Sequence, residues 1–107
     1  MAISQKAWTQ FTSADYKDAA TYCDACLINM NTGKREGWTK DACKLPVKEP
    51  NGDVNANALS AAAAALAGAR GGVQAPAAEK QKAARALARL YGMAKMPMPQ
   101  SLQLMVK

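Results

Sequence analysis

The chain has 107 residues, a formal net charge of +6 and a hydrophobic content of 50%. That length suits one domain that can bury a core of its own. The chain has no histidine, the side chain best suited to acid–base catalysis near neutral pH, so the composition argues against an enzyme. The carboxylates are scattered, and no serine or cysteine shows the pattern of an activated nucleophile. We therefore expect a non-enzymatic protein without a cofactor.

Positive charge is concentrated in the second half of the chain. Residues 1–54 carry equal numbers of basic and acidic side chains, whereas the only acid in residues 55–107 is Glu79. Such asymmetry favours an acidic partner, either a nucleic acid or an acidic protein surface. No stretch has the length of a membrane span or the form of a secretion signal, so we expect no membrane partner and synthesis in a reducing cytoplasm.

The first predicted element is a helix from about residue 14 to residue 28 or 30. Ser13 is a candidate N-cap, and the sequence N-T-G at residues 31–33 is expected to end the helix. Apolar side chains recur at helical spacing between these limits: Tyr16, Ala19, Ala20, Cys23, Cys26, Leu27 and Met30.

The three cysteines allow several interpretations. Cys23 and Cys26 share the apolar stripe of the predicted helix, so we favour buried thiols that pack as small hydrophobic groups. One alternative is a disulfide that involves Cys43. Another is a zinc site of Cys23, Cys26 and Cys43, which would need a fourth ligand from Asp24, Asp41 or a neighbouring subunit.

Residues 43–50 are expected to form an extended arm. Pro46 and Pro50 restrict their own backbone and that of the residue before each of them. The sequence P-N-G-D at residues 50–53 then predicts a turn, with proline at its second position and glycine at its fourth.

An alanine-rich helix is predicted over residues 56–69, with Asn55 as its N-cap. One apolar face contains Leu59, Ala62, Ala63 and Leu66. The remaining faces also carry methyl groups, and a helix that is apolar all round is usually buried on more than one side. We therefore expect this helix to contact a partner as well as the chain itself. Three glycines, Gly68, Gly71 and Gly72, are expected to end it.

A second helix is predicted from Pro76 to about residue 94. Its core stripe is expected to contain Ala83, Leu87, Leu90, Tyr91 and Ala94. Lys82, Arg85 and Arg89 lie on the opposite face, where they form either a solvated surface or a contact surface. The link between the two helices is short, so they are predicted to form an antiparallel hairpin.

Residues 97–107 read as a C-terminal tail rich in proline and methionine, which either docks on a partner or frays. The predicted fold is mainly α, with one helical domain over residues 1–96. It consists of an N-terminal helix, an extended proline-containing arm and an antiparallel alanine-rich helical hairpin, with little or no sheet.

Residues 43–91 resemble a small module of tailed-bacteriophage head proteins, found beside or within prohead-maturation and minor capsid proteins. The resemblance begins with a Lys-Leu-Pro element, a Gly-x-Val-Asn turn and an alanine-rich helix. A Gly-Ala-Arg-Gly break and a second helix ending in tyrosine follow. The matching residues are Lys44, Leu45, Pro46, Gly52, Val54, Asn55, Gly68, Ala69, Arg70, Gly71 and Tyr91. The resemblance covers nearly half of the chain and leaves residues 1–42 unexplained.

This resemblance implies a structural protein of the virion that is made in the bacterial host cytoplasm. It would bind the capsid shell as a decoration or minor capsid component, with the major capsid protein or another head protein as partner, and it could also form a homo-oligomer. The expected contact residues are Leu59, Ala63, Leu66, Arg70, Lys82, Arg85, Arg89, Leu102 and Leu104. Apolar burial is expected to carry the association, and the basic residues to tune it.

The alternative function is non-specific binding of nucleic acid by the basic face of the second helix. Its phosphate-binding residues would be Arg70, Lys80, Lys82, Arg85 and Arg89. Specific recognition of a base sequence is not expected, because no second set of base-reading polar residues accompanies them.

Overall fold

The computed structural model describes residues 2–68 and 72–106, and these form a mixed α/β fold. Of the described residues, 51% are helical and 13% lie in strands, so the predicted mainly α fold with little or no sheet is wrong. The strands are β1 (Ile3–Ser4), β2 (Cys26–Asn29), β3 (Cys43–Pro46) and β4 (Val54–Asn55). The α-helices are α1 (Ala19–Asp24), α2 (Ala56–Leu66), α3 (Ala77–Met93) and α4 (Gln100–Met105). Short 3-10 turns cover Trp8–Gln10, Ser13–Asp15, Arg35–Gly37 and Lys40–Ala42.

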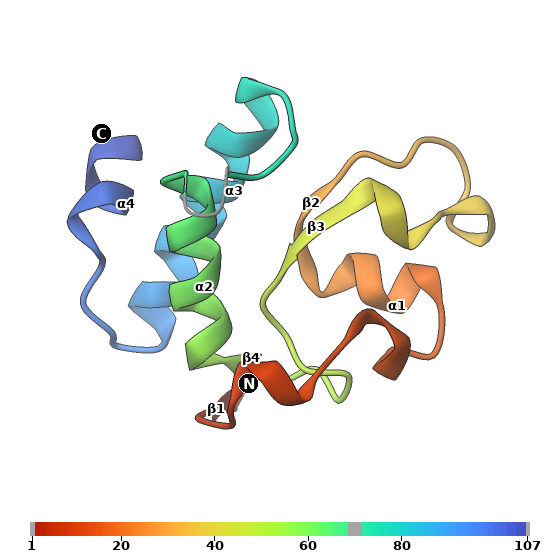
Figure 1. Ribbon diagram of the computed structural model, residues 1–107, viewed down its shortest axis with the longest axis horizontal. Coiled ribbons are helices and arrows are strands. Elements are labelled where there is room, and N and C mark those ends of the chain that lie inside the picture. Colours follow the sequence, from red (N-terminus) through yellow and green to blue (C-terminus); the bar gives the residue numbers. More distant parts are fainter. Residues whose placement is uncertain (1, 69–71, 107) are drawn as a thin grey trace.

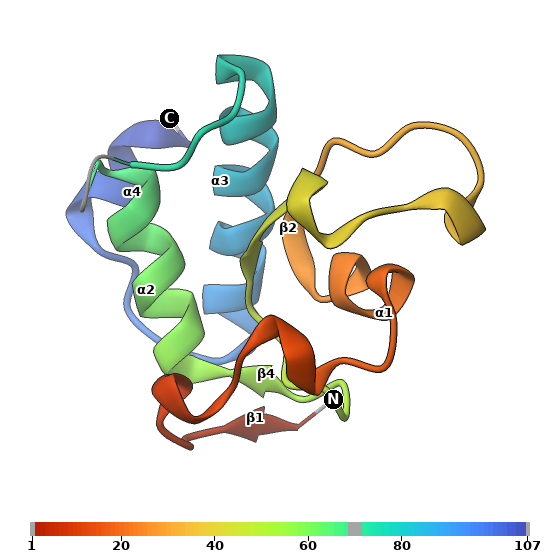
Figure 2. The same cartoon turned by 45° about the vertical axis from the view of Figure 1, so that its right-hand side comes forward.

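Helices α2 and α3 stand at the centre of the molecule. They lie side by side and run in opposite directions (Figures 1 and 2). Helix α4 packs against both of them on one side. On the other side, α3 contacts β2, α2 contacts β3, and α1 covers the outer face of this two-stranded ribbon. The N-terminal segment returns to the start of α2, where β1 pairs with β4.

The predicted helix over residues 14–30 is replaced by a short helix and a strand. Asp18 accepts a hydrogen bond from the Thr21 amide at 2.8 Å and caps α1, which starts at Ala19 and not near residue 14 as expected. The helix ends at Asp24, and β2 then pairs antiparallel with β3, with Ile28 opposite Lys44. Residues 26–29, which fitted the apolar stripe of the predicted helix, therefore form one strand of a two-stranded antiparallel ribbon. The extended arm was predicted correctly as extended, but it forms a strand of this ribbon.

The turn after β3 matches its sequence prediction. The Gly52 amide donates to the Glu49 carbonyl at 2.8 Å, with Pro50 in the second position of the turn. Gly52 has φ +96°, a backbone conformation that glycine adopts without steric cost. The turn brings the chain back so that β4 lies parallel to β1, with Ile3 opposite Val54.

Asn55 joins three parts of the fold. Its side-chain oxygen caps α2 by accepting from the Ala58 amide at 2.9 Å. Its side-chain nitrogen donates to Glu49 at 2.9 Å and to the Lys6 carbonyl at 3.1 Å. Both Asn55 and Glu49 are almost fully buried. Burial alone would raise the pKa of Glu49, but hydrogen bonds from Ser4 and Asn55 and the nearby charge of Lys6 outweigh it and hold that pKa below its usual value.

The predicted apolar face of α2 is the centre of the core. Leu59, Ala62, Ala63 and Leu66 are all buried. Small alanine side chains let α3 approach closely, and β3, β4 and α4 cover further parts of the helix. The helix was predicted to reach residue 69 but ends at Leu66, and Gly68 follows with φ +104°. Residues 69–71, which include Gly71, lie outside the described part of the chain.

The C-terminal segment also belongs to the core. Leu102 of α4 is fully buried, and the side chain of Gln81 on α3 donates to the Met105 carbonyl at 2.7 Å. Fraying is therefore wrong for residues 100–105, which form a helix packed on α2 and α3, whereas docking of this segment on a partner stays a prediction.

Replacing Asn55 tests its role in joining these parts. Asn55→Ala removes the α2 cap and leaves the buried Glu49 carboxylate without its amide donor, so we expect a loss of about 2–4 kcal/mol in the free energy of unfolding. Asn57→Ala is the matched control, since Asn57 also donates to the Lys6 carbonyl but is exposed. Its cost should stay below about 1 kcal/mol. Urea unfolding of both variants makes the comparison, and equal costs would contradict the assignment.

Tyr91 supplies a second test. It is almost fully buried, and its hydroxyl has no hydrogen-bond partner among the described residues. A buried hydroxyl without a partner costs free energy, so Tyr91→Phe should raise the free energy of unfolding by about 1 kcal/mol. Thermal unfolding followed by circular dichroism measures this change. A lower stability of the variant would show that the hydroxyl is satisfied in solution.

Candidate functional site

Four of the predicted partner-contact residues are part of the chain's own core. Leu59, Ala63 and Leu66 of α2 and Leu102 of α4 have at most 9% of their surface exposed. Their side chains therefore cannot supply an apolar contact with another protein while the fold is intact. This corrects the expectation that the apolar face of α2 would carry the association. The helix is surrounded by apolar groups because this same chain supplies its neighbours.

Two other predicted contact residues have different positions. Leu104 of α4 is 60% exposed and is available to solvent. Arg70 lies outside the described residues. Lys80, which the nucleic-acid alternative included, is half-buried near the start of α3.

The cationic face of α3 is present and exposed. We use this name for Lys82, Arg85 and Arg89, whose side chains share one side of the helix. Glu79 lies 3.6 Å from Lys82 and forms a partly exposed ion pair with it. Neither Arg85 nor Arg89 forms a salt bridge within the described ranges 2–68 and 72–106. The opposite side of the helix carries its buried residues: Ala83, Ala84, Leu87 and Tyr91.

A groove of about 260 Å³ lies between α3 and the β2–β3 ribbon, and Arg89 is among the residues that line it. We call it the α3–β2 groove. Its walls are Asp24, Ala25, Cys26, Leu27, Val47, Lys48, Ala86, Arg89, Leu90 and Met93. Met93 is 54% exposed, which is unusual for a large apolar side chain in this molecule. The groove is therefore lined by both apolar and charged side chains.

The charges around the groove do not cancel. Asp24 receives two hydrogen bonds from the Arg35 guanidinium, at 2.8 and 2.9 Å. These hydrogen bonds hold the pKa of Asp24 below its usual value, with a smaller contribution from the positive charge of Lys48. Asp24 is therefore already paired, whereas Lys48 and Arg89 make no salt bridge within the described ranges.

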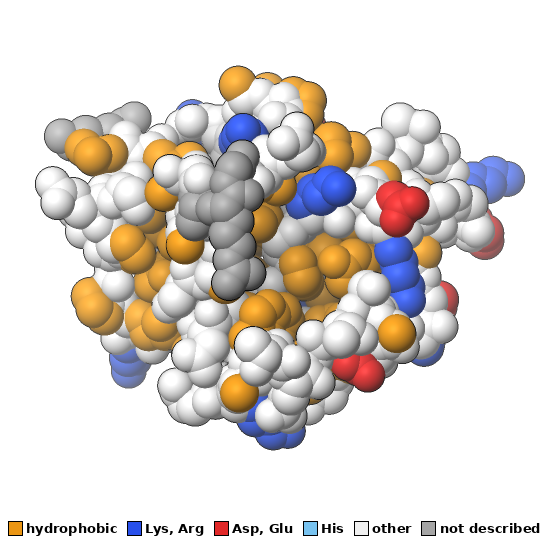
Figure 3. All heavy atoms as spheres, in the orientation of Figure 1, with side chains coloured by type: hydrophobic (Ala, Val, Ile, Leu, Met, Phe, Trp, Pro, Cys, Tyr) orange, Lys and Arg blue, Asp and Glu red, His pale blue; other side chains and the backbone are white. Residues whose placement is uncertain are grey.

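A second, more open groove of about 420 Å³ lies on the face shown in Figure 3. Hydrophobic side chains form its floor in that view, and blue lysine and arginine side chains lie at its edge. Lys40 and Lys44 are among the residues that line it, with Tyr22 and Leu45. The ammonium group of Lys40 is already bound to the carbonyls of Ser13 and Tyr16, at 2.8 and 3.3 Å.

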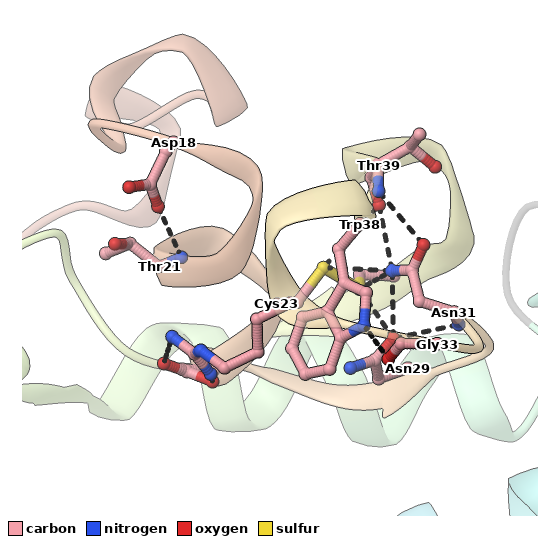
Figure 4. The surroundings of a disulfide bond; sticks show 11 residues. Asp18, Thr21, Cys23, Asn29, Asn31, Gly33, Trp38 and Thr39 are labelled. Carbon is pink, nitrogen blue, oxygen red and sulfur yellow. Dashed lines mark hydrogen bonds and ion pairs between the residues drawn. A yellow bond between two sulfur atoms is a disulfide. The ribbon is translucent and has the colours of Figure 1, made fainter.

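The cysteines differ from the favoured sequence interpretation. Cys23 of α1 and Cys43 of β3 form a disulfide, with their Cα atoms 5.4 Å apart. Asn31 lies against both sulfurs and donates to the Asn29 side chain and the Thr39 carbonyl, at 2.9 and 3.0 Å (Figure 4). The disulfide thus ties α1 to the strand ribbon and closes the loop over residues 24–42. The open alternative of a disulfide involving Cys43 is the correct one.

The zinc alternative does not match this arrangement. Two of its three proposed ligands, Cys23 and Cys43, are joined to each other, and Cys26 is left as a half-buried free thiol. Burial raises the pKa of the Cys26 thiol to about 12. Within residues 2–68 and 72–106, no cluster of three or more cysteine or carboxylate side chains could hold a metal ion. None of the described helices has the length and apolar character needed to cross a membrane.

Sequence reasoning found the basic residues of α3 but missed the groove beside them. Met93 follows Arg89 by one helical turn, so its position next to the cationic face could have been recognised. Leu27 and Lys48 come from the strand ribbon, and no local pattern indicates that they face α3. Comparisons with protein families, with curated proteins and with solved structures find no match to this chain.

The disulfide can be tested by its effect on stability. It closes a loop with a sequence separation of 20 residues, for which chain entropy predicts a stabilisation of about 3 kcal/mol. A variant with Cys23→Ala and Cys43→Ala should lose that amount in urea unfolding. Adding dithiothreitol to the parent should move it toward the variant, and Cys26→Ala should respond to dithiothreitol as the parent does. A parent whose unfolding is the same with and without dithiothreitol would contradict the disulfide.

Proposed function

We propose that the chain is a non-enzymatic docking protein that binds an acidic surface of another protein through the cationic face of α3. The resemblance of residues 43–91 to a phage head module suggests the setting: a virion, with a shell or other head protein as partner. The observation that carries the proposal is the exposure of Lys82, Arg85 and Arg89 on one side of a helix whose other side is packed in the core.

The burial of the other expected contact residues changes how the association should work. Since Leu59 and Leu66 are unavailable, apolar burial on α2 cannot carry it. The cationic face then contributes to affinity itself, in addition to steering the encounter. Charge removal on α3 should therefore weaken docking, in contrast to the expectation from sequence that it would only change the rate and the salt response.

Binding of nucleic acid is the second candidate, and the same cations favour it. Phosphate contacts need positive charge but no apolar groove, because the phosphate backbone has no apolar side chain to bury there. The α3–β2 groove places Leu90 and Met93 directly beside Arg89. An apolar patch with a charged edge is the arrangement found at protein–protein interfaces, so the groove favours a protein partner.

Charge removal on α3 tests the proposal. A variant with Lys82, Arg85 and Arg89 changed to Gln should lose co-sedimentation with empty phage heads. The control variant changes Lys17, Lys34 and Lys95 to Gln, which removes the same charge from exposed positions elsewhere. It should sediment with heads as the parent does. Far-ultraviolet circular dichroism of both variants should match the parent, because none of these side chains belongs to the core.

A duplex titration at two salt concentrations separates the two candidates. Each phosphate contact releases counterions, so affinity for DNA would fall steeply with salt. We expect the parent to bind heads and to show no duplex binding at the higher salt concentration. Tight, salt-dependent duplex binding by a parent that does not sediment with heads would replace the proposed function with the nucleic-acid alternative.

A further inference from the structure

We propose that the α3–β2 groove binds an exposed segment of a partner protein in which an apolar side chain is flanked by carboxylates. This inference deepens the proposed function, because it names the chemistry of the partner segment that the α3–β2 groove would recognise. It rests on the proposed function only for the source of that segment, and the groove itself can be tested with isolated peptides.

The apolar residues of the groove can bury a side chain of the partner segment. Leu27 of β2 and Val47, just after β3, form one side, while Ala86, Leu90 and Met93 of α3 form the other. A volume of about 260 Å³ lies below the range of roughly 300–1,000 Å³ typical of small-molecule sites. It is large enough for an apolar side chain of a peptide. The 54% exposure of Met93 leaves its flexible thioether free to cover such a side chain.

The charged residues of the lining decide which groups must flank that side chain. Lys48 lines the ribbon side and Arg89 the helix side, and neither forms a salt bridge within the described residues. Asp24, the acidic residue of the lining, is bound by Arg35 through both of its oxygens. A segment entering the groove therefore meets uncompensated positive charge on two sides. Carboxylates of the partner are the complementary groups, and charge-assisted hydrogen bonds to them are the stronger kind.

The groove is held in shape before any partner arrives. Its helix side belongs to a 17-residue helix that is packed on the core. Its strand side is paired with β3, and the disulfide between Cys23 and Cys43 ties that ribbon to α1. A preformed site avoids most of the entropy cost of ordering loops on binding. The groove can thus contribute affinity even though it is small.

The test uses short capped peptides and fluorescence anisotropy on the full chain. The probe peptide has a central leucine with aspartate and glutamate on both sides. One comparison peptide replaces the leucine by serine, and another replaces the acids by lysine. We expect the probe to bind with at least about tenfold higher affinity than either comparison peptide, since each loses one of the two kinds of contact.

Variants locate the binding. Lys48→Gln combined with Met93→Gln should weaken probe binding by at least about tenfold. The matched control combines Lys17→Gln with Leu104→Gln, which removes one cation and one exposed apolar side chain outside the groove. It should bind the probe as the parent does. Equal binding by the two double variants, or equal binding of the leucine and serine peptides, would overturn the inference.

Other occupants give different outcomes. Displacement of the probe by a DNA duplex at low molar excess would assign the groove to phosphates, and concentration-dependent dimerisation of the parent that Met93→Gln abolishes would assign it to a second copy of this chain. Either result would overturn the proposal.

Head binding distinguishes the groove from the proposed function. Suppose that the variant with Lys82, Arg85 and Arg89 changed to Gln loses head binding, whereas Lys48→Gln combined with Met93→Gln keeps it. That result would reject the groove as a binding site and retain the proposed function. Probe binding without any head binding would reject the proposed function and retain the groove.

Discussion

The side chain of Asn55 holds together segments that the rest of the structure depends on. One amide group caps α2, binds the buried Glu49 of the preceding turn and receives the N-terminal segment through the Lys6 carbonyl. The pKa of Glu49 lies below its usual value, so its ionised form stabilises the fold above the unfolded-state pKa. That contribution is lost as the pH falls through the folded-state pKa. A single polar contact of this kind is costly to remove, because it leaves several buried groups without partners at once.

The features predicted correctly from sequence are those that short-range chemistry determines. The Asn55 cap, the glycine turn at residue 52 and the exposed basic stripe of α3 each follow from residues within one or two turns of each other. The apolar face of α2 was also predicted correctly. The elements that cover this face were not predicted, because the chain topology brings α3, β3 and α4 against α2. An all-apolar helix indicates burial, but the sequence does not say whether the chain or a partner provides it.

The features that sequence reasoning missed depend on pairing between distant segments. Residues 26–29 fit a helical stripe as well as a strand, and the choice is made by β3, which lies beyond a long loop. A short apolar run is ambiguous in this way, because helix and strand patterns overlap over four residues. The same pairing brings Cys43 to Cys23 and places Leu27 and Val47 opposite α3. The candidate groove therefore could not be predicted without the ribbon that forms one of its sides.

The division of α3 into two sides separates binding from stability. Ala83, Leu87 and Tyr91 are buried in the core, while Lys82, Arg85 and Arg89 are exposed to solvent. The positive charges of α3 oppose folding only weakly, since they are spread along one exposed face where water screens them. Among the described residues their salt bridge is the partly exposed pair of Lys82 with Glu79, and such a pair stabilises a fold only weakly. The helix therefore stabilises the fold through its buried side and leaves positive charge exposed on the other.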